Sequence, residues 1–350
     1  MLCGSRHCSR LFCPPGQRCA SGIASRARSV RRASSAAAAP LRLSSRRLQA
    51  GAASALLDSV ETFLFDCDGV IWRGDEVIKG VPEALDLLRD RGKRLIFVTN
   101  NSTKSRAGAL SKFHSLGIES VTAAEIFSSS FAVAAYLQPR LRPQDKVYII
   151  GESGICEELD LVGISHLGGP SDSGKVPDMG SGGRIEVDSD VRAVVVGFDR
   201  EICYYKLQYA THAIRGPNQA EFIATNCDAV AHFTNAQEWA AAGAMVGALK
   251  GATEQSPTVI GKPNPFMLEH ICAEFGIERH QICMVGDRLD TDIVFGNTGG
   301  TQTLLVLSGV TSETELLERC GDGGGSGDPL QPDHVAESLP SVLELAQTWR

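Results

Sequence analysis

The chain has 350 residues, of which 43% are hydrophobic and 21% are charged, and its net charge is −7. This length supports one large domain or two ordinary ones, and the composition excludes a disordered or fibrous protein. Residues 1–57 hold ten arginines and no lysine or acidic residue, so the remaining residues carry a net charge of −17. Such an acidic remainder argues against nucleic acid or an anionic membrane surface as the main partner. The sequence contains no run of eighteen apolar residues, the length that a helix crossing a bilayer needs.

The first 57 residues are basic and rich in serine and alanine, and they lack the uninterrupted apolar stretch of a secretory signal. This composition is typical of an organelle transit peptide. We therefore predict that residues 1–57 form a disordered targeting segment outside the fold, with a plain disordered tail as the alternative. The seven cysteines that follow show no CxxC spacing, which favours free thiols over a disulfide framework or a zinc site.

From residue 58 onward, short β-rich runs alternate with helical stretches. The pattern predicts strands at 61–66, 93–100, 146–151, 191–198, 221–226, 258–263, 281–287 and 301–307. It predicts helices at 81–92, 104–116, 122–137, 265–275 and 290–297, the third of which begins with a capping box of Thr122 and Glu125. Glycine-rich loops are expected at 168–183 and 320–329, the second before a last strand and helix. Strands that alternate with helices imply parallel pairing and a layered α/β fold.

Two carboxylates follow the first predicted strand. The run FLFDCDGVIW places Asp66 and Asp68 two positions apart, and Gly69 comes next. In an open parallel sheet, ligands bind beyond the carboxyl ends of the strands. Two carboxylates there are costly unless a cation neutralises them, and Mg²⁺ prefers oxygen ligands. Taken alone, the motif is also compatible with a plain acidic turn.

A second strand end is acidic as well. The run MVGDRLDTDI places Asp287 directly after an apolar stretch, with Asp290 and Asp292 close behind. Asp290 is placed to cap the helix that follows, but helix capping does not account for Asp287. Two acidic strand ends therefore indicate a cation site more strongly than either one does alone.

The two strand ends that lie between these motifs carry groups that suit a phosphate. Thr99, Asn100 and Asn101 follow one strand close to a helix N-terminus, where backbone N–H groups favour an anion. Lys262 follows another strand within the run VIGKPNP, although a lone lysine after a strand is usually a solvated surface charge. The four strand ends together indicate a site for a phosphate group and a cation.

The ordered motifs D-x-D-G-V, T-N-N, G-K-P and G-D-R-x-x-T-D-I resemble those of the haloacid dehalogenase superfamily of phosphohydrolases. The resemblance covers nearly all of residues 58–350, and about 160 residues separate the second motif from the third. This spacing is similar to that of the C2-capped branch, which contains nitrophenylphosphatases, pyridoxal phosphatases and phosphoglycolate phosphatases. The resemblance implies a three-layer Rossmann-like core with a parallel sheet in residues 58–141 and 257–350, and an inserted α/β cap domain in residues 142–256.

Within the expected cap, the runs VVVGFDREICYYKLQYATHAIRG and FIATNCDAVAHFTNAQEW look closest to photorespiratory phosphoglycolate phosphatases of algae and plants. The resemblance implies Mg²⁺-dependent hydrolysis of 2-phosphoglycolate in the plastid stroma, with the mitochondrion as the alternative location. Pyridoxal phosphate, glycerol phosphate and nitrophenyl phosphate are the alternative substrates. A regulatory protein that keeps this fold without turnover would require a broken motif, and none of the four is broken.

The resemblance also implies catalytic and metal-binding roles. Asp66 would attack phosphorus and form an aspartyl-phosphate, and Asp68 would protonate the leaving alkoxide and then take a proton from water. Mg²⁺ would be held by the side chains of Asp66 and Asp287 and by the main-chain carbonyl of Asp68. Gly69 supports this loop. Asp292 would orient Lys262 or a metal-bound water.

The phosphate oxygens would be held by one group of core residues, namely Thr99, Asn100, Asn101 and Lys262. Arg200, Asn226 and His232 are the cap residues considered for contact with the leaving group. The small-residue run 240–249 suits packing within the domain or a homodimer formed through the cap. Cys67 lies between the two catalytic aspartates, whose charge raises a thiol pKa and so disfavours a redox switch.

Overall fold

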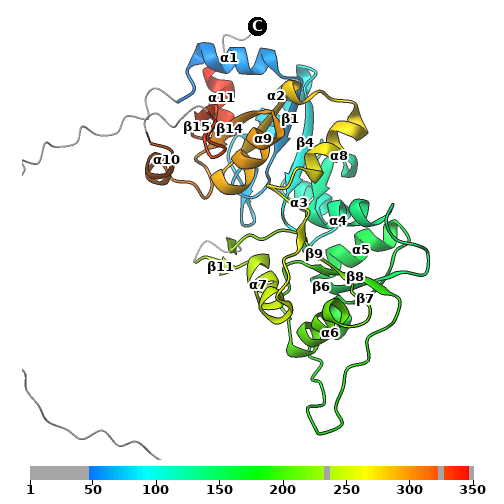
Figure 1. The fold of residues 1–350 in the computed structure, drawn as a ribbon. Coiled ribbons are helices and arrows are strands. Elements are labelled where there is room, and N and C mark those ends of the chain that lie inside the picture. The colour runs from blue at the N-terminus through cyan, green and yellow to red at the C-terminus, as the bar shows by residue number, and fades with distance from the viewer. Residues whose placement is uncertain (1–46, 232–236, 322–326, 347–350) are drawn as a thin grey trace, which may run out of the picture. The chain divides into compact units, whose positions relative to one another are not determined.

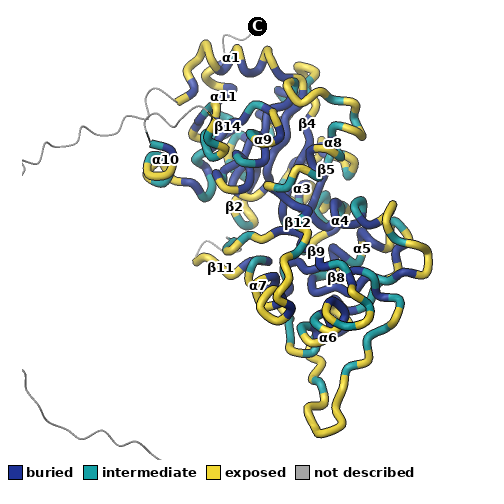
Figure 2. Tube along the Cα trace, viewed as in Figure 1, coloured by how far each residue is buried: buried dark blue, intermediate teal, exposed yellow. Residues whose placement is uncertain are grey.

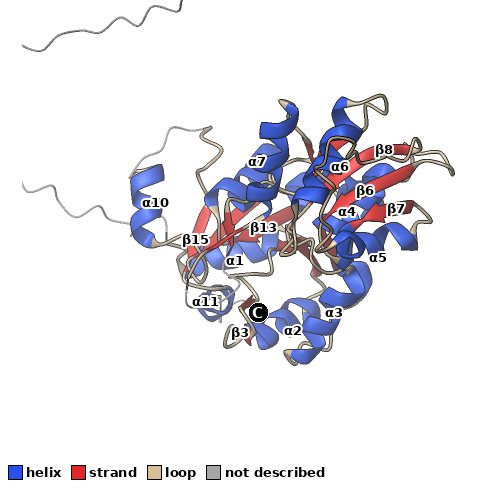
Figure 3. Cartoon of the chain, turned by 90° about the horizontal axis from the view of Figure 1, so that it is seen from below, coloured by secondary structure: helices blue, strands red, loops and turns tan. Residues whose placement is uncertain are grey.

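The computed structural model describes residues 47–231, 237–321 and 327–346. Two parallel β-sheets organise this part of the chain, and helices lie against the faces of both (Figure 1; Figure 3). This arrangement confirms the predicted α/β class. Among the described residues, no helix has both the length and the apolar character that a membrane span requires.

The first sheet has six parallel strands in the order β15-β14-β13-β1-β4-β5. These strands are β1 (Thr62–Phe65), β4 (Arg94–Thr99), β5 (Ile126–Ser128), β13 (Ile282–Gly286), β14 (Gln302–Val306) and β15 (His334–Ala336). Successive side chains of the central strand β1 point to opposite faces, so Phe63 and Phe65 join one hydrophobic cluster and Leu64 joins another. Both faces are therefore covered, as the continuous apolar run predicted.

Helices cover both faces of this sheet and give the core its three layers. The core helices are α1 (Ala50–Ser59), α2 (Val81–Asp90), α3 (Arg106–Ser115), α8 (Phe266–Phe275), α9 (Val294–Gly299), α10 (Glu313–Cys320) and α11 (Leu339–Leu345). Buried residues of α1, α2 and α11 pack in the cluster of Phe63, whereas those of α8 and α9 pack in the cluster of Leu64. Figure 2 shows the strands as buried segments and the outer helix faces as exposed.

The second sheet has five parallel strands in the order β12-β9-β8-β6-β7. These are β6 (Lys146–Ile150), β7 (Ser165–Gly168), β8 (Val191–Val196), β9 (Glu221–Ala224) and β12 (Thr258–Val259). Helices α4 (Ser129–Leu137) and α5 (Ser153–Leu161) pack on one face, and α6 (Tyr204–Arg215) and α7 (Ala242–Thr253) pack on the other. Two short hairpins complete the strands, β2 (Trp72–Arg73) with β3 (Glu76–Val77) and β10 (Val230–Ala231) with β11 (Trp239–Ala240).

The predicted boundary at residue 57 is wrong, because the folded chain begins earlier. Helix α1 covers Ala50–Ser59 and buries Ala53, Leu56 and Leu57 in the core. Just before it, the backbone N–H of Leu48 donates to the carbonyl of Val335 at 2.8 Å. Composition alone cannot separate a leader from a helix that directly follows it and whose first eight residues, Ala50–Leu57, carry no charge. The part of the targeting prediction that covers residues 1–46 lies outside the described residues.

The predicted helix at 122–137 is interrupted. The Thr122–Glu125 capping box forms, but it closes only the 3₁₀ turn Ala123–Glu125. Strand β5 follows on the edge of the first sheet, and helix α4 then begins at Ser129. Burial of the β5 side chains against β4 outweighs their helix propensity, which is a weak local preference.

Strand β12 corrects the predicted start of the second core segment at residue 257. It pairs with β9, with Thr258 opposite Ile223, and so belongs to the second sheet. A two-residue extended run does not specify which sheet edge it joins, so the hydrogen bonds to β9 determine its place.

Two other predicted segments differ in detail. The helix predicted at 290–297 begins as the π turn Leu289–Ile293 and continues as α9. The predicted loop 168–183 opens with the last residue of β7 and a 3₁₀ turn.

Candidate active site

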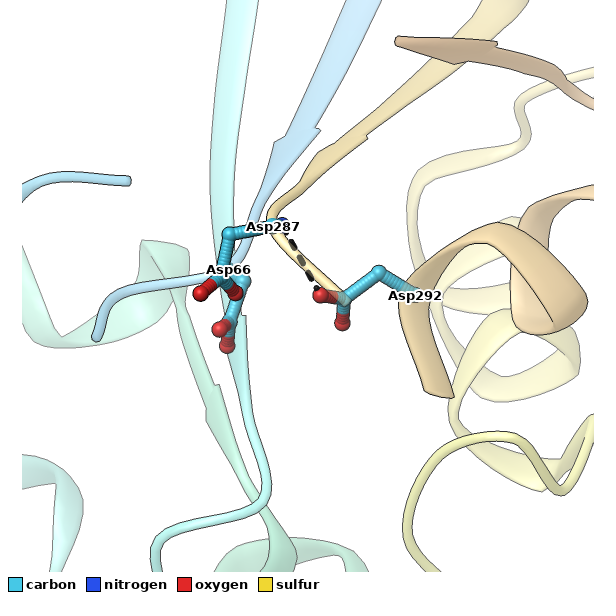
Figure 4. Close-up of side chains that lie close together, drawn as sticks. All are labelled: Asp66, Asp287 and Asp292. Atoms are coloured by element: carbon cyan, nitrogen blue, oxygen red, sulfur yellow. Dashed lines mark hydrogen bonds between the residues drawn. The ribbon is translucent and has the colours of Figure 1, made fainter. Parts of the chain in front are cut away.

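Asp66 and Asp287 meet because the strands that precede them are neighbours in the first sheet. Asp66 follows β1, Asp287 follows β13, and the two strands pair in parallel. Carboxylate oxygens of Asp66, Asp287 and Asp292 lie within 4.8 Å of one another, and all three residues are buried. Figure 4 shows Asp292 reaching back from the π turn, so that its carboxylate accepts from the backbone N–H of Asp287 at 3.1 Å.

Lys262 enters this cluster from the segment after β12. Its ammonium group donates to Oδ1 of Asp66 at 2.8 Å, to Oδ1 of Asp292 at 2.7 Å and to the carbonyl of Val98 at 2.8 Å. The side chain is only 2% exposed, unlike the solvated lysine that is usual after a strand. Burial lowers its pKa, but contact with Asp292 and Asp66 outweighs burial and raises it, so the ammonium stays charged.

The cluster of carboxylates fits a bound cation. Burial raises the pKa of Asp66 and of Asp287, and Lys262 opposes the increase only in part. Oδ1 of Asp287 is buried without a hydrogen-bond partner, whereas Oδ2 accepts from the backbone N–H of Val310 at 2.6 Å. An unpaired buried carboxylate oxygen costs free energy that an oxygen-liganded cation would offset. Residues that suit a divalent cation are therefore present.

Two glycines leave room for Asp287 beside this cluster. A Cβ atom on Gly69 would lie 2.3 Å from Oδ2 of Asp287, and one on Gly309 would lie 1.9 Å from it. Gly69 also has a φ of +88°, a conformation that side chains other than that of glycine rarely adopt. A larger residue at either position would displace Asp287.

Asp292 positions other groups instead of offering a free oxygen. Its Oδ1 accepts from Lys262, and its Oδ2 accepts from the backbone N–H groups of Asp287 and Arg288, both at 3.1 Å. The wide π turn brings the carboxylate back onto the end of β13. Both carboxylate oxygens of Asp292 are thus engaged in hydrogen bonds within the site.

Asp68 lies three residues after the end of β1, and its side chain is half exposed. Its Oδ1 accepts from the indole Nε1 of Trp72 at 2.8 Å. Cys67, between the two aspartates, is buried, and burial together with Asp66 and Asp68 raises the pKa of its thiol. A thiol of this kind is a poor nucleophile, which agrees with the sequence-based expectation.

The end of β4 and the loop that follows it carry the Thr99–Asn101 motif to the same edge of the sheet. Oγ1 of Thr99 accepts from the backbone N–H of Asn101 at 3.1 Å, and Oδ1 of Asn101 accepts from the backbone N–H of Thr103 at 2.9 Å. The side-chain amide of Asn100 donates to the carbonyl of Lys262 at 3.0 Å, and its Oδ1 is buried without a partner. The side chain of Asn101 therefore shapes the loop, while Asn100 joins it to the segment of Lys262.

A cavity of about 500 Å³ brings these motifs together with residues of the second sheet's domain. The core residues that line it include Asp66, Asp68, Gly69, Thr99, Asn100, Asn101, Asp287 and Arg288. The other lining residues include Phe198, Asn226, Asp228, Val230 and Ala241. Lys262 does not line the cavity itself, but it contacts Asp66, which does.

Of the three residues considered for contact with the leaving group, the structure describes two, and they differ in their position relative to the cavity. Asn226 lines the cavity, and its side-chain amide donates to the carbonyl of Asn100 at 2.8 Å. Arg200 does not line it, but forms a two-bond ion pair with Glu152 at 2.6 and 3.0 Å. His232 lies outside the described residues. Sequence reasoning missed Trp72 and Arg288, although both stand inside the motifs it singled out.

Comparisons with known proteins agree with this geometry. Residues 63–165 match a model described as haloacid dehalogenase-like hydrolase, and residues 259–342 match a second described as HAD-hydrolase-like. Phosphoglycolate phosphatase 1A, chloroplastic, of Arabidopsis thaliana is 57% identical over 292 residues, which are 83% of this chain and 78% of the relative.

Two solved structures are also similar. The p-nitrophenyl phosphatase of Archaeoglobus fulgidus has a TM-score of 0.68 and 30% identity, covering 82% of this chain and 99% of its own. A glycerol phosphate phosphatase of Mycobacterium tuberculosis in complex with magnesium has a TM-score of 0.66 and 28% identity, covering 82% of this chain and 78% of its own. With the motifs assembled at the strand ends as the geometry shows, the chain belongs to the haloacid dehalogenase-like hydrolases.

Proposed function

We propose that this protein is a Mg²⁺-dependent phosphatase that hydrolyses 2-phosphoglycolate to glycolate and phosphate through an aspartyl-phosphate. The observation that carries the proposal is the Asp66 carboxylate, which lies at the cavity beside Asp287 and 2.8 Å from the ammonium of Lys262. A carboxylate so placed is suited to attack an anion, because positive charge stands next to it. The 57% identical plant relative supports the choice of substrate.

In the first step, a carboxylate oxygen of Asp66 forms a bond to phosphorus while the bond from phosphorus to the glycolate oxygen breaks. Asp68 gives its proton to that oxygen, which avoids release of a strongly basic alkoxide. In the second step, Asp68 takes a proton from a water molecule whose oxygen attacks phosphorus, and Asp66 leaves as a free carboxylate. Both aspartates line the cavity that the substrate would enter.

We assign the cation to the side chains of Asp66 and Asp287 and to the main-chain carbonyl of Asp68. When bound there, a divalent cation supplies charge neutralisation that lets the carboxylate and the phosphate approach each other. Mg²⁺ suits this set of oxygen ligands. The mycobacterial relative is described in complex with magnesium, and another structure of it in complex with calcium.

We assign the phosphate oxygens to Lys262 and to polar groups of Thr99, Asn100 and Asn101. Lys262 keeps its positive charge because two carboxylates contact it. Thr99, at the end of β4, and the next two residues line the cavity. Charge in a phosphoryl-transfer transition state is spread over the equatorial oxygens, so fixed donors at this place stabilise it.

The carboxylate of phosphoglycolate needs a cationic partner, and we assign Arg288 to it. Among the described lining residues, the basic ones are Arg73 and Arg288. Arg73 is bound to the carbonyl of Ser308. Arg288 directly follows Asp287, and its guanidinium makes bonds of 3.3 Å to Asp290 and 3.4 Å to the carbonyl of Val230. These bonds are long, and a guanidinium fork suits two-bond recognition of a carboxylate.

The experiment that tests the proposed function compares kcat/KM for phosphoglycolate, glycerol phosphate, pyridoxal phosphate and nitrophenyl phosphate in the presence of Mg²⁺. A protein that lacks residues 1–46 keeps all the described contacts and is the form to use. We expect a preference for phosphoglycolate of more than about tenfold, equivalent to 1.4 kcal/mol of transition-state binding. A smaller preference would favour a generalist phosphatase, and a preference for glycerol phosphate would favour the activity named for the mycobacterial relative.

We also propose a plastid location. The supporting observation is the basic, serine-rich leader together with the word "chloroplastic" in the plant relative's name. Fusion of residues 1–46 to a fluorescent protein should direct it to the plastid. Import into mitochondria would contradict this location.

We propose that the protein forms a homodimer through helix α7. Four small residues are exposed on one side of this helix, at the helical spacing that lets two backbones approach: Ala244, Gly247, Ala248 and Gly251. Light scattering should give twice the monomer mass, and Gly247→Arg should return the monomer. A monomeric mass for the unmodified protein would contradict the proposal.

A further inference from the structure

Trp72 holds one oxygen of the Asp68 carboxylate. The indole Nε1 donates to Oδ1 of Asp68 at 2.8 Å, from the first residue of strand β2. The Asp68 side chain is 50% exposed at the cavity, so packing alone would leave it free to change rotamer. A hydrogen bond from a fixed donor restricts that freedom.

Trp72 is itself fixed by helix α3. The residue is only 4% exposed, and its ring meets the ring of Phe113 edge-on, with centroids 4.8 Å apart and an interplanar angle of 71°. The ammonium of Lys112, one residue earlier on α3, lies 4.5 Å from the centroid of the Trp72 ring and 3.9 Å from Oδ1 of Asp68. Helix α3 therefore forms a seat for the indole and adds a positive charge near the same oxygen.

The backbone between the two residues is closed into a tight turn. The N–H of Gly69 donates to the carbonyl of Trp72 at 2.7 Å, and the N–H of Ile71 donates to the carbonyl of Cys67 at 2.9 Å. Gly69 has positive φ and no room for a Cβ atom. The turn therefore fixes the backbone at both ends of the hydrogen bond between Trp72 and Asp68.

We propose that Trp72 is a positioning residue for the acid step: its indole N–H holds Oδ1 of Asp68, which leaves Oδ2 as the oxygen that delivers the proton. The inference rests on the acid role of Asp68 in the proposed function. As the bond from phosphorus to the leaving oxygen breaks and the bond to Asp66 forms, the proton on Oδ2 passes to the leaving oxygen. Asp68 then remains as a carboxylate whose Oδ1 still accepts from Trp72.

This role makes a prediction that a purely structural role does not. An alkoxide leaving group is a strong base and needs the proton, whereas nitrophenolate is a stable anion and leaves without it. Misplacing the acid therefore lowers kcat/KM, which reports the first step, for alkyl phosphates and leaves kcat/KM for nitrophenyl phosphate nearly unaffected. A general loss of folded protein would lower the rates of hydrolysis of both substrates by the same factor.

Trp72→Phe keeps an aromatic ring and removes the N–H donor. We expect kcat/KM, which reports the first step, to fall by roughly 10- to 100-fold for phosphoglycolate and glycerol phosphate, and by less than about threefold for nitrophenyl phosphate. Phe127→Leu is the control, because it removes a buried ring that packs against Phe131 and Phe275 in the other hydrophobic cluster and leaves the indole and its seat unchanged. In that variant the ratio of the two activities should stay that of the unmodified enzyme. Benzothienylalanine at position 72 has the shape of tryptophan without its N–H donor, and it serves as the test if Trp72→Phe does not fold.

Asp68→Asn, assayed in parallel, separates failure of this inference from failure of the proposed function. If Asp68→Asn lowers kcat/KM for both kinds of substrate equally, Asp68 is not the acid of the first step, and neither that assignment nor the inference holds. If Asp68→Asn slows alkyl phosphates selectively and the Trp72 variants do not, only the role of Trp72 is overturned. Selective loss in both supports the inference.

Discussion

The ammonium of Lys262 lies 2.7 Å from Oδ1 of Asp292, and both side chains are buried. This contact joins the segment after β12 to the π turn before α9, although 30 residues separate the two side chains in the chain. The same lysine contacts Asp66, so Asp292 controls where positive charge stands beside the proposed nucleophile.

Asp292→Asn should lower kcat by at least about tenfold, because Lys262 loses one of the two carboxylates that hold it. Breaking a buried ion pair also costs stability, so we expect the free energy of unfolding to fall by roughly 3 kcal/mol. Steady-state kinetics and denaturant titration measure both quantities. Asp160→Asn, on a carboxylate whose side chain is 70% exposed, is the control and should change neither.

Asp66→Asn should abolish turnover and leave the fold intact. The amide cannot form the aspartyl-phosphate, and removal of one of three crowded carboxylates relieves repulsion in the site. Circular dichroism should match that of the unmodified protein, and labelled phosphate should no longer be trapped on the chain. Residual activity above roughly 2% of the unmodified enzyme would exclude Asp66 as the nucleophile.

The stability of the metal-free protein should fall as the pH rises. Burial raises the pKa of Asp66 from 3.8 to about 7 and raises the pKa of Asp287 as well, so the folded protein binds these protons more tightly than the unfolded chain. This contribution to stability is fully present below the unfolded pKa and is lost as the pH rises through the folded one.

Thermal melts in EDTA and in Mg²⁺ at pH 5 and pH 8 measure this effect. Mg²⁺ should raise Tm more at pH 8 than at pH 5, because the cation binds the ionised carboxylates. In Asp287→Asn the difference between the two pH values should shrink. An equal Mg²⁺ effect at both pH values, or a larger one at pH 5, would contradict the cation site.

Arg288→Gln should raise KM for phosphoglycolate and lower kcat/KM by more than about tenfold, because the substrate carboxylate loses its partner. Nitrophenyl phosphate has no carboxylate, so its kcat/KM should change by less than roughly threefold. Arg200→Gln is the matched control, since Arg200 pairs with Glu152 away from the cavity. An equal loss on both substrates in Arg288→Gln would assign Arg288 to metal or phosphate binding instead.

Leu56→Ala should destabilise the protein by about 3 kcal/mol, because the side chain is buried in the core although it lies in the arginine-rich N-terminal region. The matched substitution Leu161→Ala, at a residue that is 66% exposed, should cost less than about 0.5 kcal/mol. Denaturant unfolding measures both changes. Equal effects in the two variants would show that helix α1 does not pack as the structure has it.

The sequence alone predicted the alternation of strands and helices and the positions of the four motifs. Apolar runs such as that of β1 are buried on both faces, so their pattern follows directly from the local sequence. Polar residues directly after such runs must lie at one edge of a parallel sheet. For this reason the local pattern was enough to place Asp66, Asp287 and the Thr99–Asn101 motif together, and all of them line the cavity.

Tertiary structure alone decided the contacts between residues far apart in the chain. Helix α1 joins the core, β12 joins the second sheet, and Lys262 is buried between two carboxylates, because packing and pairing outweigh weak local preferences. The seat that α3 makes for Trp72, and the separation of Arg200 from the cavity, depend on the spatial order of elements. Sequence periodicity determines which residues face inward, and three-dimensional packing determines which partners they meet there.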